Sequence, residues 1–480
     1  MAPLVFLLAG FIVSRPMYWH EGVFFDIRML GQDWAIHFIE PQLLRERLLE
    51  SVYFLHSQPP LFNLFLGGML HAFGTGTADA FAWTYTGMGL LLALCLYGVL
   101  VRLTVPRWPS ALLTLLFMAS PATVLYENWL FYTYPEALLL CASALFFHRF
   151  AASRRAVWAW IFFALLGLLA LSRSTFHLVW YLAMVGLVLA TVAQAPRRTV
   201  VLAAVGPLLL IVALYAKNAF YFGTFSASSW LGMNFSRVTL EPTPLAERQA
   251  LVREGTLPPL ALAKSFLPLS DYPPEYRRVS GPDVPVLRRE RKLNGGPNFN
   301  HEGYIPLSRD FARASFALVR ARPGLYLHHV GRAFRLFFAP ASDYPFLASN
   351  REQVPGLSEF FNVSLLGMYG ASAPELRGQW ISEEEISERT LWNWVGVFVF
   401  GLVAVGGLTW RERRSTGGLS PESATRLFLA GNILYVTLLS NLIEYLENNR
   451  MRYPIDPLVL ALGATAVVEC LRRLRSRLKE

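Results

Sequence analysis

Ionisable and hydrogen-bonding side chains gather in five short clusters, each beside an apolar run of the chain. The first cluster holds Asp26 and Asp33 among aromatic residues, followed by His56, Ser57 and Gln58 before Pro59-Pro60. The other four hold Tyr126 and Glu127, then Arg173 and His177, then Lys217 and Asn218, and finally Glu447, Asn449, Arg450 and Arg452 in the run from Glu444 to Tyr453. Charged groups at bilayer depth are costly, so each cluster is a candidate functional site.

These residue types suit the displacement of a phosphate by a hydroxyl group. A carboxylate can take the proton of the hydroxyl, and fixed cations can hold the departing phosphate. The predicted catalytic residues are Asp26, as the base, with Asp33 and Glu127. The predicted phosphate ligands are Arg450 and Arg452, because guanidinium groups match phosphate oxygens, with Lys217 and Arg173 as secondary candidates. The alternatives are a solvated aspartate that caps a helix and arginines that reach toward lipid headgroups.

Other polar residues are predicted to contact substrate. They are His56, Gln58, Tyr126, His177, Glu447 and Asn449, together with Trp230, Asn234 and His301 of a long polar segment. A tryptophan face and amide side chains suit carbohydrate hydroxyls, although packing within the loop explains Trp230 as well. His56, Glu127 and His177 could also bind a divalent metal ion, whereas a lone histidine is more often structural. The three cysteines lie in or beside apolar runs, so no cysteine metal site is expected.

The composition indicates a multi-pass membrane protein. Hydrophobic residues make up 54% of the 480 residues and charged residues only 16%. The formal net charge of +10 does not indicate nucleic-acid binding, because the basic residues cluster at the ends of apolar runs, as the positive-inside rule requires of cytoplasmic loops. No cleavable signal peptide is evident after the first apolar run.

Ten apolar runs are expected to span the membrane. They lie near 2–14, 80–101, 110–126, 132–150, 156–172, 176–194, 199–221, 391–410, 425–443 and 454–471. Arginine clusters follow every second span, which assigns those connections to the cytoplasm. This alternation requires that the short apolar piece at 60–73 does not cross, and its length suits a re-entrant or interfacial helix.

The same topology places five polar connections together on the outer side. They are 15–58, 127–133, 172–177, 221–390 and 444–453, and they contain the five clusters. The chain then divides into an N-terminal transmembrane catalytic module (1–221), a large extracytoplasmic loop (222–390) and C-terminal transmembrane helices with a basic cytoplasmic tail (391–480). Within the loop, helices are expected at 308–321 and 324–338.

Several of these motifs resemble the membrane glycosyltransferases of the C-type fold. The matching features are an acidic residue early in the first external loop, His56 shortly before Pro59-Pro60, a glutamate near the outer end of a later span, and Glu447 to Arg450 leading into the last span. The nearest groups are the bacterial relatives of the protein O-mannosyltransferases and of the aminoarabinose transferase that modifies lipid A. The chain departs from them where Ile27 follows Asp26 and where no lysine precedes the prolines.

The resemblance implies an all-α polytopic fold of about 10–11 transmembrane helices, with juxtamembrane helices in the first external loop and a large extracytoplasmic loop. It implies a polyprenyl-phosphate-linked sugar as donor and action on the outer face. We therefore expect an enzyme that transfers a hexosyl or pentosyl group, with inversion, to an extracytoplasmic protein, lipid or glycan, in a bacterial cytoplasmic membrane. The partners are then the lipid-linked sugar, the acceptor and the bilayer, with no nucleic acid.

Two other classes remain open at this stage. A lipid or solute transporter would carry ionisable residues deep within its spans and some repeat symmetry, which the sequence does not show. A non-catalytic membrane subunit that binds glycans or partners would not need the carboxylates of the first loop. The sequence has no Gly-x-x-x-x-Gly-Lys, His-Glu-x-x-His, Gly-x-Ser-x-Gly or Asp-x-Asp motif, and the lack of Asp-x-Asp favours a lipid-linked donor over a sugar nucleotide.

Overall fold

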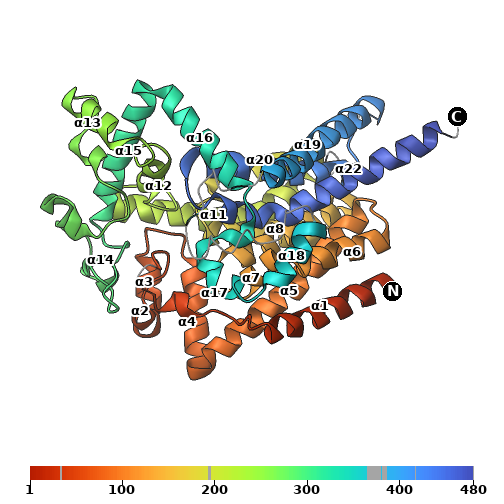
Figure 1. The fold of residues 1–480 in the computed structure, drawn as a ribbon, viewed down its shortest axis with the longest axis horizontal. Helices are drawn as coiled ribbons and strands as arrows, with labels where there is room; N and C mark the ends of the chain where they lie inside the picture. Colours follow the sequence, from red (N-terminus) through yellow and green to blue (C-terminus); the bar gives the residue numbers. More distant parts are fainter. Residues whose placement is uncertain are drawn as a thin grey trace.

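The structure is a computed structural model that describes residues 1–32, 35–192, 196–364, 380, 386, 388–416 and 418–478. These residues form helices joined by turns and short loops (Figure 1). Two isolated β-bridges, Asp26 with Trp129 and Arg291 with Pro297, are the extended pairings among them, and the described part contains no β-strand.

The apolar helices form an elongated bundle. In chain order they are α1 (Ala2–His20), α5 (Thr77–Arg102), α6 (Arg107–Met118), α7 (Pro121–Glu127), α8 (Thr133–Ser153), α9 (Ala156–Ser172), α10 (Leu178–Thr191), α11 (Arg197–Phe222), α19 (Glu388–Thr416), α20 (Pro421–Ile443) and α22 (Asp456–Arg477). Seven helical stretches of the described chain are long and apolar enough to cross a membrane, and α6 with α7 forms an eighth that is bent by 61°. α9 and α10 are apolar but shorter, with 17 and 14 residues. Each of the ten expected spans thus corresponds to an apolar helix or bent pair, and the chain is an all-helical, multi-pass membrane protein.

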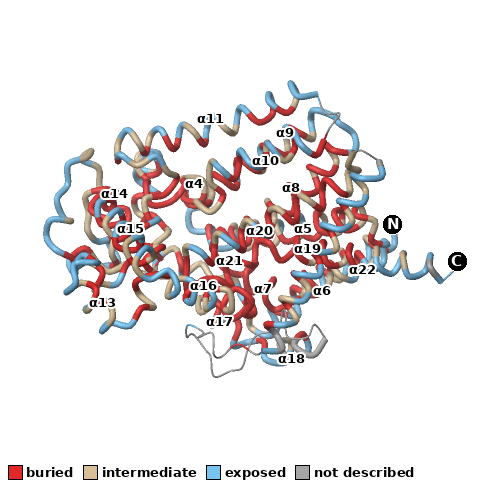
Figure 2. Tube along the Cα trace, turned by 90° about the horizontal axis from the view of Figure 1, so that it is seen from above, coloured by how far each residue is buried: buried red, intermediate tan, exposed pale blue. Residues whose placement is uncertain are grey.

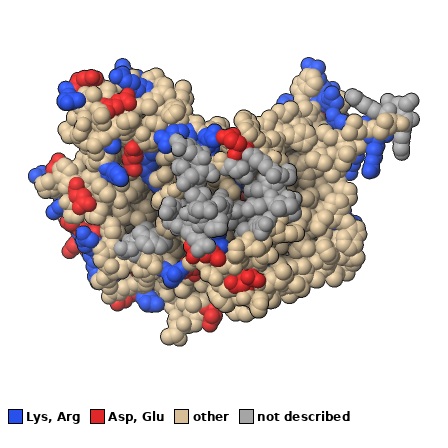
Figure 3. All heavy atoms as spheres, in the orientation of Figure 1, with Lys and Arg blue, Asp and Glu red and all other residues tan. Residues whose placement is uncertain are grey.

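Basic side chains collect at one end of this bundle. Arg472 near the end of α22 donates to the hydroxyl of Thr104 at 3.0 Å and to its carbonyl oxygen at 2.8 Å, which joins the first and last arginine clusters of the sequence. Figure 3 shows blue side chains at this end, charges of both signs at the opposite end, and a largely uncharged surface on the bundle between them. The charge pattern therefore agrees with the orientation expected from the positive-inside rule.

The first part of the large loop, drawn in green in Figure 1, folds at the opposite end of the molecule, and the later part, drawn in teal and cyan, returns over the bundle. Its helices are α12 (Leu231–Val238), α13 (Leu245–Arg253), α14 (Pro285–Arg288), α15 (Tyr304–Ala321), α16 (Pro323–Phe337), α17 (Ala348–Arg351) and α18 (Pro355–Ser364). The helices expected at 308–321 and 324–338 are thus confirmed as α15 and α16. α12 and α15 cross so closely that a Cβ atom at Gly232 would lie 1.7 Å from the carbonyl oxygen of Ser308. Trp230, Met233 and Phe311 belong to a hydrophobic core that the loop forms for itself.

Short helices connect the first external loop to the bundle. They are α2 (Pro41–Glu46), α3 (Leu48–Tyr53) and α4 (Leu61–Phe73). A 3₁₀ turn at Gly74–Gly76 separates α4 from α5, and Gly74 has a φ of +52°, which favours glycine. α4 packs against α2, α3, α5 and α9. α11 is tied to the same loop, because the ammonium group of Lys217 donates to the carbonyl oxygens of Tyr53 at 2.9 Å and Leu55 at 2.7 Å.

Buried residues, coloured red in Figure 2, are concentrated where α5, α7, α8, α20 and the short α21 (Asn448–Arg452) meet. An ion pair between Arg15 and Glu127 is part of this core, with the two side chains 3% and 2% exposed. Arg15 Nε donates to Glu127 at 2.9 Å, and the hydroxyl of Tyr134 donates to the same carboxylate at 2.7 Å. Glu127 therefore joins α1 to α7 and α8.

We expect Glu127→Ala to lower the free energy of unfolding by about 3–5 kcal/mol, because it leaves Arg15 buried without its partner. The double variant Arg15→Met, Glu127→Leu should have a free energy of unfolding close to that of the wild type, since it removes both charges together. Thermal unfolding of the detergent-purified protein measures both effects. An E127A variant as stable as the wild type would contradict this structural role.

Candidate functional site

A cavity of about 430 Å³ lies between the bundle and the large loop. Its walls come from all five connections that the charge pattern assigns to the outer side. The polar lining residues are His37 and Gln58, Tyr132, Arg173 to Thr175 and His177, then Ser226, Ser228, Trp230, Asn234 and Arg237, and finally Ser440, Glu444, Glu447 and Arg450. Segments far apart in the sequence thus converge on one chamber, which we call the large cavity.

Three guanidinium groups line the large cavity. Arg450 lies on α21 and is 1% exposed, and its guanidinium group is 5.0 Å from the ring of Phe131 and 5.4 Å from that of Tyr344. Arg173 follows the end of α9 and pairs with Glu136 in the first turn of α8 at 2.8 Å. The third is Arg237 on α12.

Two carboxyl groups alternate with these guanidinium groups. Glu447 forms ion pairs with Arg450 and with Arg237, the latter at 3.4 Å, and Arg237 also lies 3.0 Å from Glu444. Burial raises the pKa of Glu444 to about 8, and Arg237 only partly offsets this rise. Burial also acts to raise the pKa of Glu447, but the charges of Arg450 and Arg237 outweigh it and hold that pKa well below its usual range. With Glu444 protonated at neutral pH, at most two carboxylates, Glu447 and Glu136, oppose the three guanidinium groups, so the cavity favours an anionic ligand.

One side of the large cavity is apolar and open. Val179 at the start of α10, Phe225 after α11 and Leu231 on α12 line it, and their side chains are 68%, 60% and 55% exposed. Leu439 and Ile443 of α20 continue this surface. Because α10 and α20 belong to the membrane bundle and α12 to the large loop, the apolar opening lies where the bundle meets the loop, and the charged residues lie deeper in the cavity.

A smaller cavity of about 250 Å³ adjoins the large one. Ile36, His37, Arg237, Phe266 and Glu447 line both cavities and form the partition between them. The rest of the small cavity is lined by Met29, Ala35, Phe131, Glu241, Ser265, Tyr344, Phe346, Trp380 and Leu446, among which aromatic rings predominate. Two chambers with one charged, aromatic partition can hold two ligands side by side.

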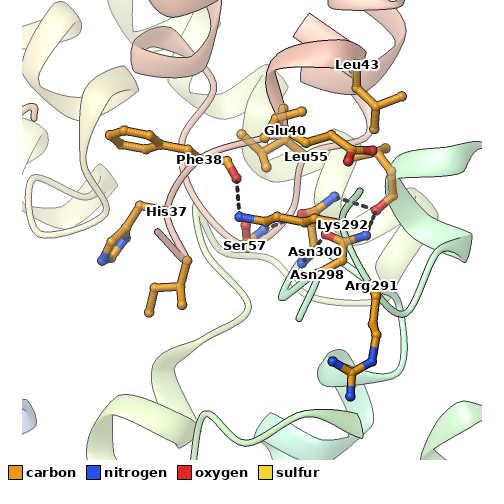
Figure 4. A pocket seen from close by; sticks show the side chains of 13 residues that line it. His37, Phe38, Glu40, Leu43, Leu55, Ser57, Arg291, Lys292, Asn298 and Asn300 are labelled. Atoms are coloured by element: carbon orange, nitrogen blue, oxygen red, sulfur yellow. Dashed lines mark hydrogen bonds between the residues drawn. The ribbon is translucent and has the colours of Figure 1, made fainter. Parts of the chain in front are cut away.

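The large loop holds the backbone around His37 in place. Lys292 donates to the carbonyl oxygens of Ala35 at 2.8 Å and Phe38 at 2.9 Å, and Figure 4 shows the second of these bonds. Asn63 on α4 accepts from the amide of Ile39 at 2.9 Å and donates to the carbonyl oxygen of His37 at 3.1 Å. In Figure 4 the imidazole of His37 points away from the Lys292 cluster. The backbone on both sides of His37 is therefore held in place.

The structure brings many of the predicted site residues together. Those that line the large cavity are Arg173, Arg450, Gln58, His177, Trp230, Asn234 and Glu447. Trp230 is 1% exposed and its indole N–H donates to the carbonyl oxygen of Phe299 at 3.2 Å, so it serves the core of the loop and the cavity wall at once. Packing of Trp230 within the loop is thus confirmed, and its contact with substrate stays a prediction.

Asp26 lies outside both cavities. Its carboxylate forms a two-pronged ion pair with Arg28, with distances of 2.9 Å and 2.7 Å, and its backbone pairs with Asn128 and Leu130. Asp33, the second predicted carboxylate of this loop, lies outside the described residues. The expected catalytic role of Asp26 therefore remains a prediction without a cavity contact to support it.

Seven other predicted residues also lie away from both cavities, and each has a partner that explains its burial or position. Glu127 pairs with Arg15, and Lys217 donates to the two carbonyl groups described above. Arg452 pairs with Asp456 at 3.0 Å and donates to the carbonyl oxygen of Ala339. Tyr126 donates to the carbonyl oxygen of Ala341, and Asn449 donates to that of Pro340. His56 contacts Ser229 at 2.7 Å and Asn300 at 2.9 Å, and His301 accepts from Gly303 at 3.0 Å.

The predicted metal ligands do not form a common site among the described residues. Both ring nitrogens of His56 have protein partners, Glu127 is occupied by Arg15 and Tyr134, and Nδ1 of His177 accepts from the amide of Trp180 at 3.4 Å. The described residues contain no group of three histidine, cysteine, aspartate or glutamate side chains arranged to hold a metal ion.

Three acidic or basic residues of the large cavity were not among the predicted site residues: His37, Arg237 and Glu444. Glu444 stands three residues before Glu447, in the run already singled out. Arg237 stands one turn after Asn234 on the same helix face, so helical spacing could have indicated it. His37 lies in the acidic-aromatic segment of the first loop, and no local motif distinguishes it.

No protein-family model matches the chain, and no curated protein matches it in sequence. Solved structures of the oligosaccharyltransferase from Archaeoglobus fulgidus match it at low identity. The complex of that enzyme, AglB, with an inhibitory peptide and a dolichol-phosphate gives a TM-score of 0.45 and 13% identity, covering 99% of this chain and 51% of that chain. The apo form gives a TM-score of 0.41 and 10% identity, covering 99% of this chain and 52% of that chain. The form tethered to an acceptor peptide gives a TM-score of 0.43 and 13% identity, covering 99% of this chain and 50% of that chain.

The chain thus spans about half the length of these structures, and a likeness at this level assigns neither family nor activity. The fold and the cavities themselves define the class: a multi-pass, all-helical membrane protein with an arginine-lined chamber beside an apolar opening. Its function follows from the chemistry of that chamber.

The pKa of Glu444 predicts a fall in stability with rising pH. A carboxyl whose pKa is raised on folding from 4.5 to about 8 favours the folded state most below pH 4.5, and this contribution is lost as the pH rises to about 8. We expect the melting temperature of the wild type to fall between pH 5 and pH 9. The melting temperature of Glu444→Gln, which mimics the protonated form, should fall less over the same range.

Glu254→Gln, which changes an exposed carboxylate of the large loop, is the matched control and should follow the wild type. Differential scanning fluorimetry in detergent at a series of pH values measures all three proteins. Parallel curves for the wild type and E444Q would contradict a protonated Glu444.

Proposed function

We propose that this protein is a membrane glycosyltransferase that moves a sugar from a polyprenyl-phosphate donor to an extracytoplasmic acceptor. One observation carries the proposal. Five connections that the charge pattern alone assigns to the outer side converge on a single cavity, which has excess positive charge and an apolar opening. A ligand with a phosphate and a hydrocarbon chain matches both properties.

Arg450 and Arg173 are proposed to hold the donor phosphate. Each guanidinium group faces the cavity and is bound to one carboxylate, Glu447 or Glu136, which fixes its orientation. Charge-assisted hydrogen bonds from such groups are about twice as strong as neutral ones and match the geometry of phosphate oxygens. The hydrocarbon chain would leave through the opening beside Val179 and Leu231, where apolar side chains are exposed.

Trp230, Gln58 and Asn234 are proposed to contact the sugar. They lie together in the wall of the large cavity and offer an aromatic ring and two amide groups, which suit carbohydrate hydroxyls. A hydroxyl of the acceptor would then displace the phosphate at the anomeric carbon with inversion. Because the phosphate is already a good leaving group, this displacement needs a base and fixed cations rather than a strong acid.

This assignment places the protein with the C-type-fold membrane glycosyltransferases that its short motifs resemble, including the bacterial relatives of the protein O-mannosyltransferases and of the lipid A aminoarabinose transferase. The cavity would lie on the outer face of a bacterial cytoplasmic membrane, with a protein, lipid or glycan as acceptor. The division at residues 221 and 390 into catalytic module, loop and C-terminal helices is part of the same proposal.

Arg450→Ala and Arg173→Ala should each weaken binding of undecaprenyl phosphate by about tenfold or more, because a hydrogen bond to a charged group contributes about 1.5–3 kcal/mol. Binding is measured with the protein in nanodiscs. Turnover is followed with a panel of undecaprenyl-phosphate sugars, and the release of undecaprenyl phosphate is measured. The same assay with a chelator and with added Mg²⁺ or Mn²⁺ tests the divalent ion suggested by the sequence.

Arg155→Ala, an exposed arginine on the cytoplasmic side, is the matched control and should bind as the wild type does. Arg450→Lys and Arg173→Lys keep the positive charge but lose the two-pronged guanidinium group. Their affinity for undecaprenyl phosphate should lie between that of the wild type and that of the alanine variants. Failure of the wild type to bind undecaprenyl phosphate would favour the transporter or partner-binding alternatives and overturn the proposal.

A further inference from the structure

The partition between the two cavities contains a group suited to proton transfer. Five residues line both chambers: Ile36, His37, Arg237, Phe266 and Glu447. Two of them are apolar, Arg237 holds its protons, and Glu447 is neutralised by two guanidinium groups. Of these five, His37 is the one with a basic nitrogen that is not engaged in an ion pair.

The surroundings of His37 keep its imidazole neutral and oriented. Its ring centre lies 5.3 Å from that of Phe131, 5.6 Å from that of Tyr132 and 5.4 Å from that of Trp230. Burial, together with the charges of Arg450, Arg173 and Arg237, lowers the pKa of His37 to about 3, although Glu447 opposes them. The imidazole is therefore neutral, and one of its nitrogens has a free electron pair that can accept a proton.

The hydroxyl of Tyr132 lies 3.4 Å from Nδ1 of His37. If Nδ1 carries the proton and donates it to this oxygen, Nε2 is left as the acceptor. Among the described residues no hydrogen bond to Nε2 is formed. The clamp from Lys292 and Asn63 holds the backbone on both sides of the residue, so the ring does not depend on a mobile loop for its position.

The small cavity suits a ring that carries hydroxyl groups. The rings of Trp380 and Tyr344 meet edge to face with centres 5.8 Å apart, and Phe346 lies 5.8 Å from Trp380. Glu241 and Ser265 supply polar atoms in the same chamber, where the carboxylate of Glu241 accepts from the amide of Ser265 at 2.9 Å. Aromatic faces with a few hydrogen-bonding groups bind the two kinds of surface that a sugar ring presents.

We propose that His37 is the catalytic base of this enzyme and takes the proton from a carbohydrate hydroxyl of an acceptor bound in the small cavity. The inference rests on the proposed function, with the donor in the large cavity on the other side of the partition. It replaces Asp26, whose carboxylate is held by Arg28 and reaches neither chamber.

The acceptor oxygen forms a bond to the anomeric carbon of the sugar, and its proton passes to Nε2 of His37. The bond between the anomeric carbon and the phosphate oxygen breaks, and its electron pair stays on the phosphate. Undecaprenyl phosphate leaves with one more negative charge, which Arg450 and Arg173 stabilise, and His37 returns its proton to water.

The experiment separates transfer from donor binding. His37→Ala and His37→Gln are prepared in nanodiscs, with octyl β-glucoside as a carbohydrate acceptor and the panel member that the wild type turns over as donor. Undecaprenyl phosphate should bind to both variants within about twofold of the wild type, whereas kcat should fall at least about 100-fold, as loss of a general base requires. Added imidazole should restore part of the activity of H37A and not of H37Q, whose side chain fills the space.

Two controls keep the result specific. His328→Ala removes an exposed histidine of α16 and should keep kcat within about threefold of the wild type. Asp26→Asn removes the carboxylate of the alternative base and compares the two assignments directly. Transfer by H37A and H37Q within tenfold of the wild type, or loss of kcat in D26N with His37 intact, overturns the assignment to His37. A fall in donor binding equal to the fall in transfer overturns it as well, because His37 would then only support the cavity.

The outcomes also distinguish this proposal from the one on which it rests. A wild-type protein that binds no undecaprenyl phosphate fails the proposed function itself. A wild type that binds and transfers, with H37 variants that do the same, fails only the assignment of the base. Loss of kcat with unchanged donor binding supports His37 as the base, with or without rescue by imidazole, provided that the KM for octyl β-glucoside stays within about threefold of the wild type. A rise in this KM alone overturns the assignment to His37.

Discussion

The structure depends on a row of buried ionisable groups in which acidic and basic side chains alternate: Glu444, Arg237, Glu447 and Arg450. A buried ion is tolerated only beside a partner, and removing one member leaves an uncompensated charge. Arg237 comes from the large loop, whereas the other three come from the segment between the last two membrane helices. The row therefore fixes the loop against the bundle, and the volume and charge of the cavity between them follow from that contact.

The same pairing rule decides what each arginine is free to do. Arg452 faces Asp456 and two backbone carbonyl groups, which use its Nε and Nη1 donors within the core. Arg173 is paired with one carboxylate and still lines the cavity, as does Arg450. Two arginines two residues apart in the last external segment thus have different roles, because one points into the protein and the other toward a chamber.

Topology could be predicted from the sequence because it depends on sums over many residues. Apolar runs and arginine clusters gave the helices and the set of outer connections, and Arg173, Trp230 and Arg450 were found through those connections. Partner choice could not be predicted in the same way. Glu127 looked like a site residue until Arg15, 112 positions earlier, proved to be its partner. His37 became visible only when chain segments from α4 and the large loop were seen to hold it.

The apolar opening beside Val179, Phe225 and Leu231 has a kinetic consequence. A hydrophobic ligand that enters sideways from the bilayer arrives by diffusion in two dimensions, so its encounter rate depends on its surface density among the lipids and not on its amount per volume of water. For such a chamber the natural unit of substrate concentration is mole fraction in the membrane. Diluting the ligand with bulk lipid would then slow its capture even when the quantity of ligand and protein in the vessel stays the same.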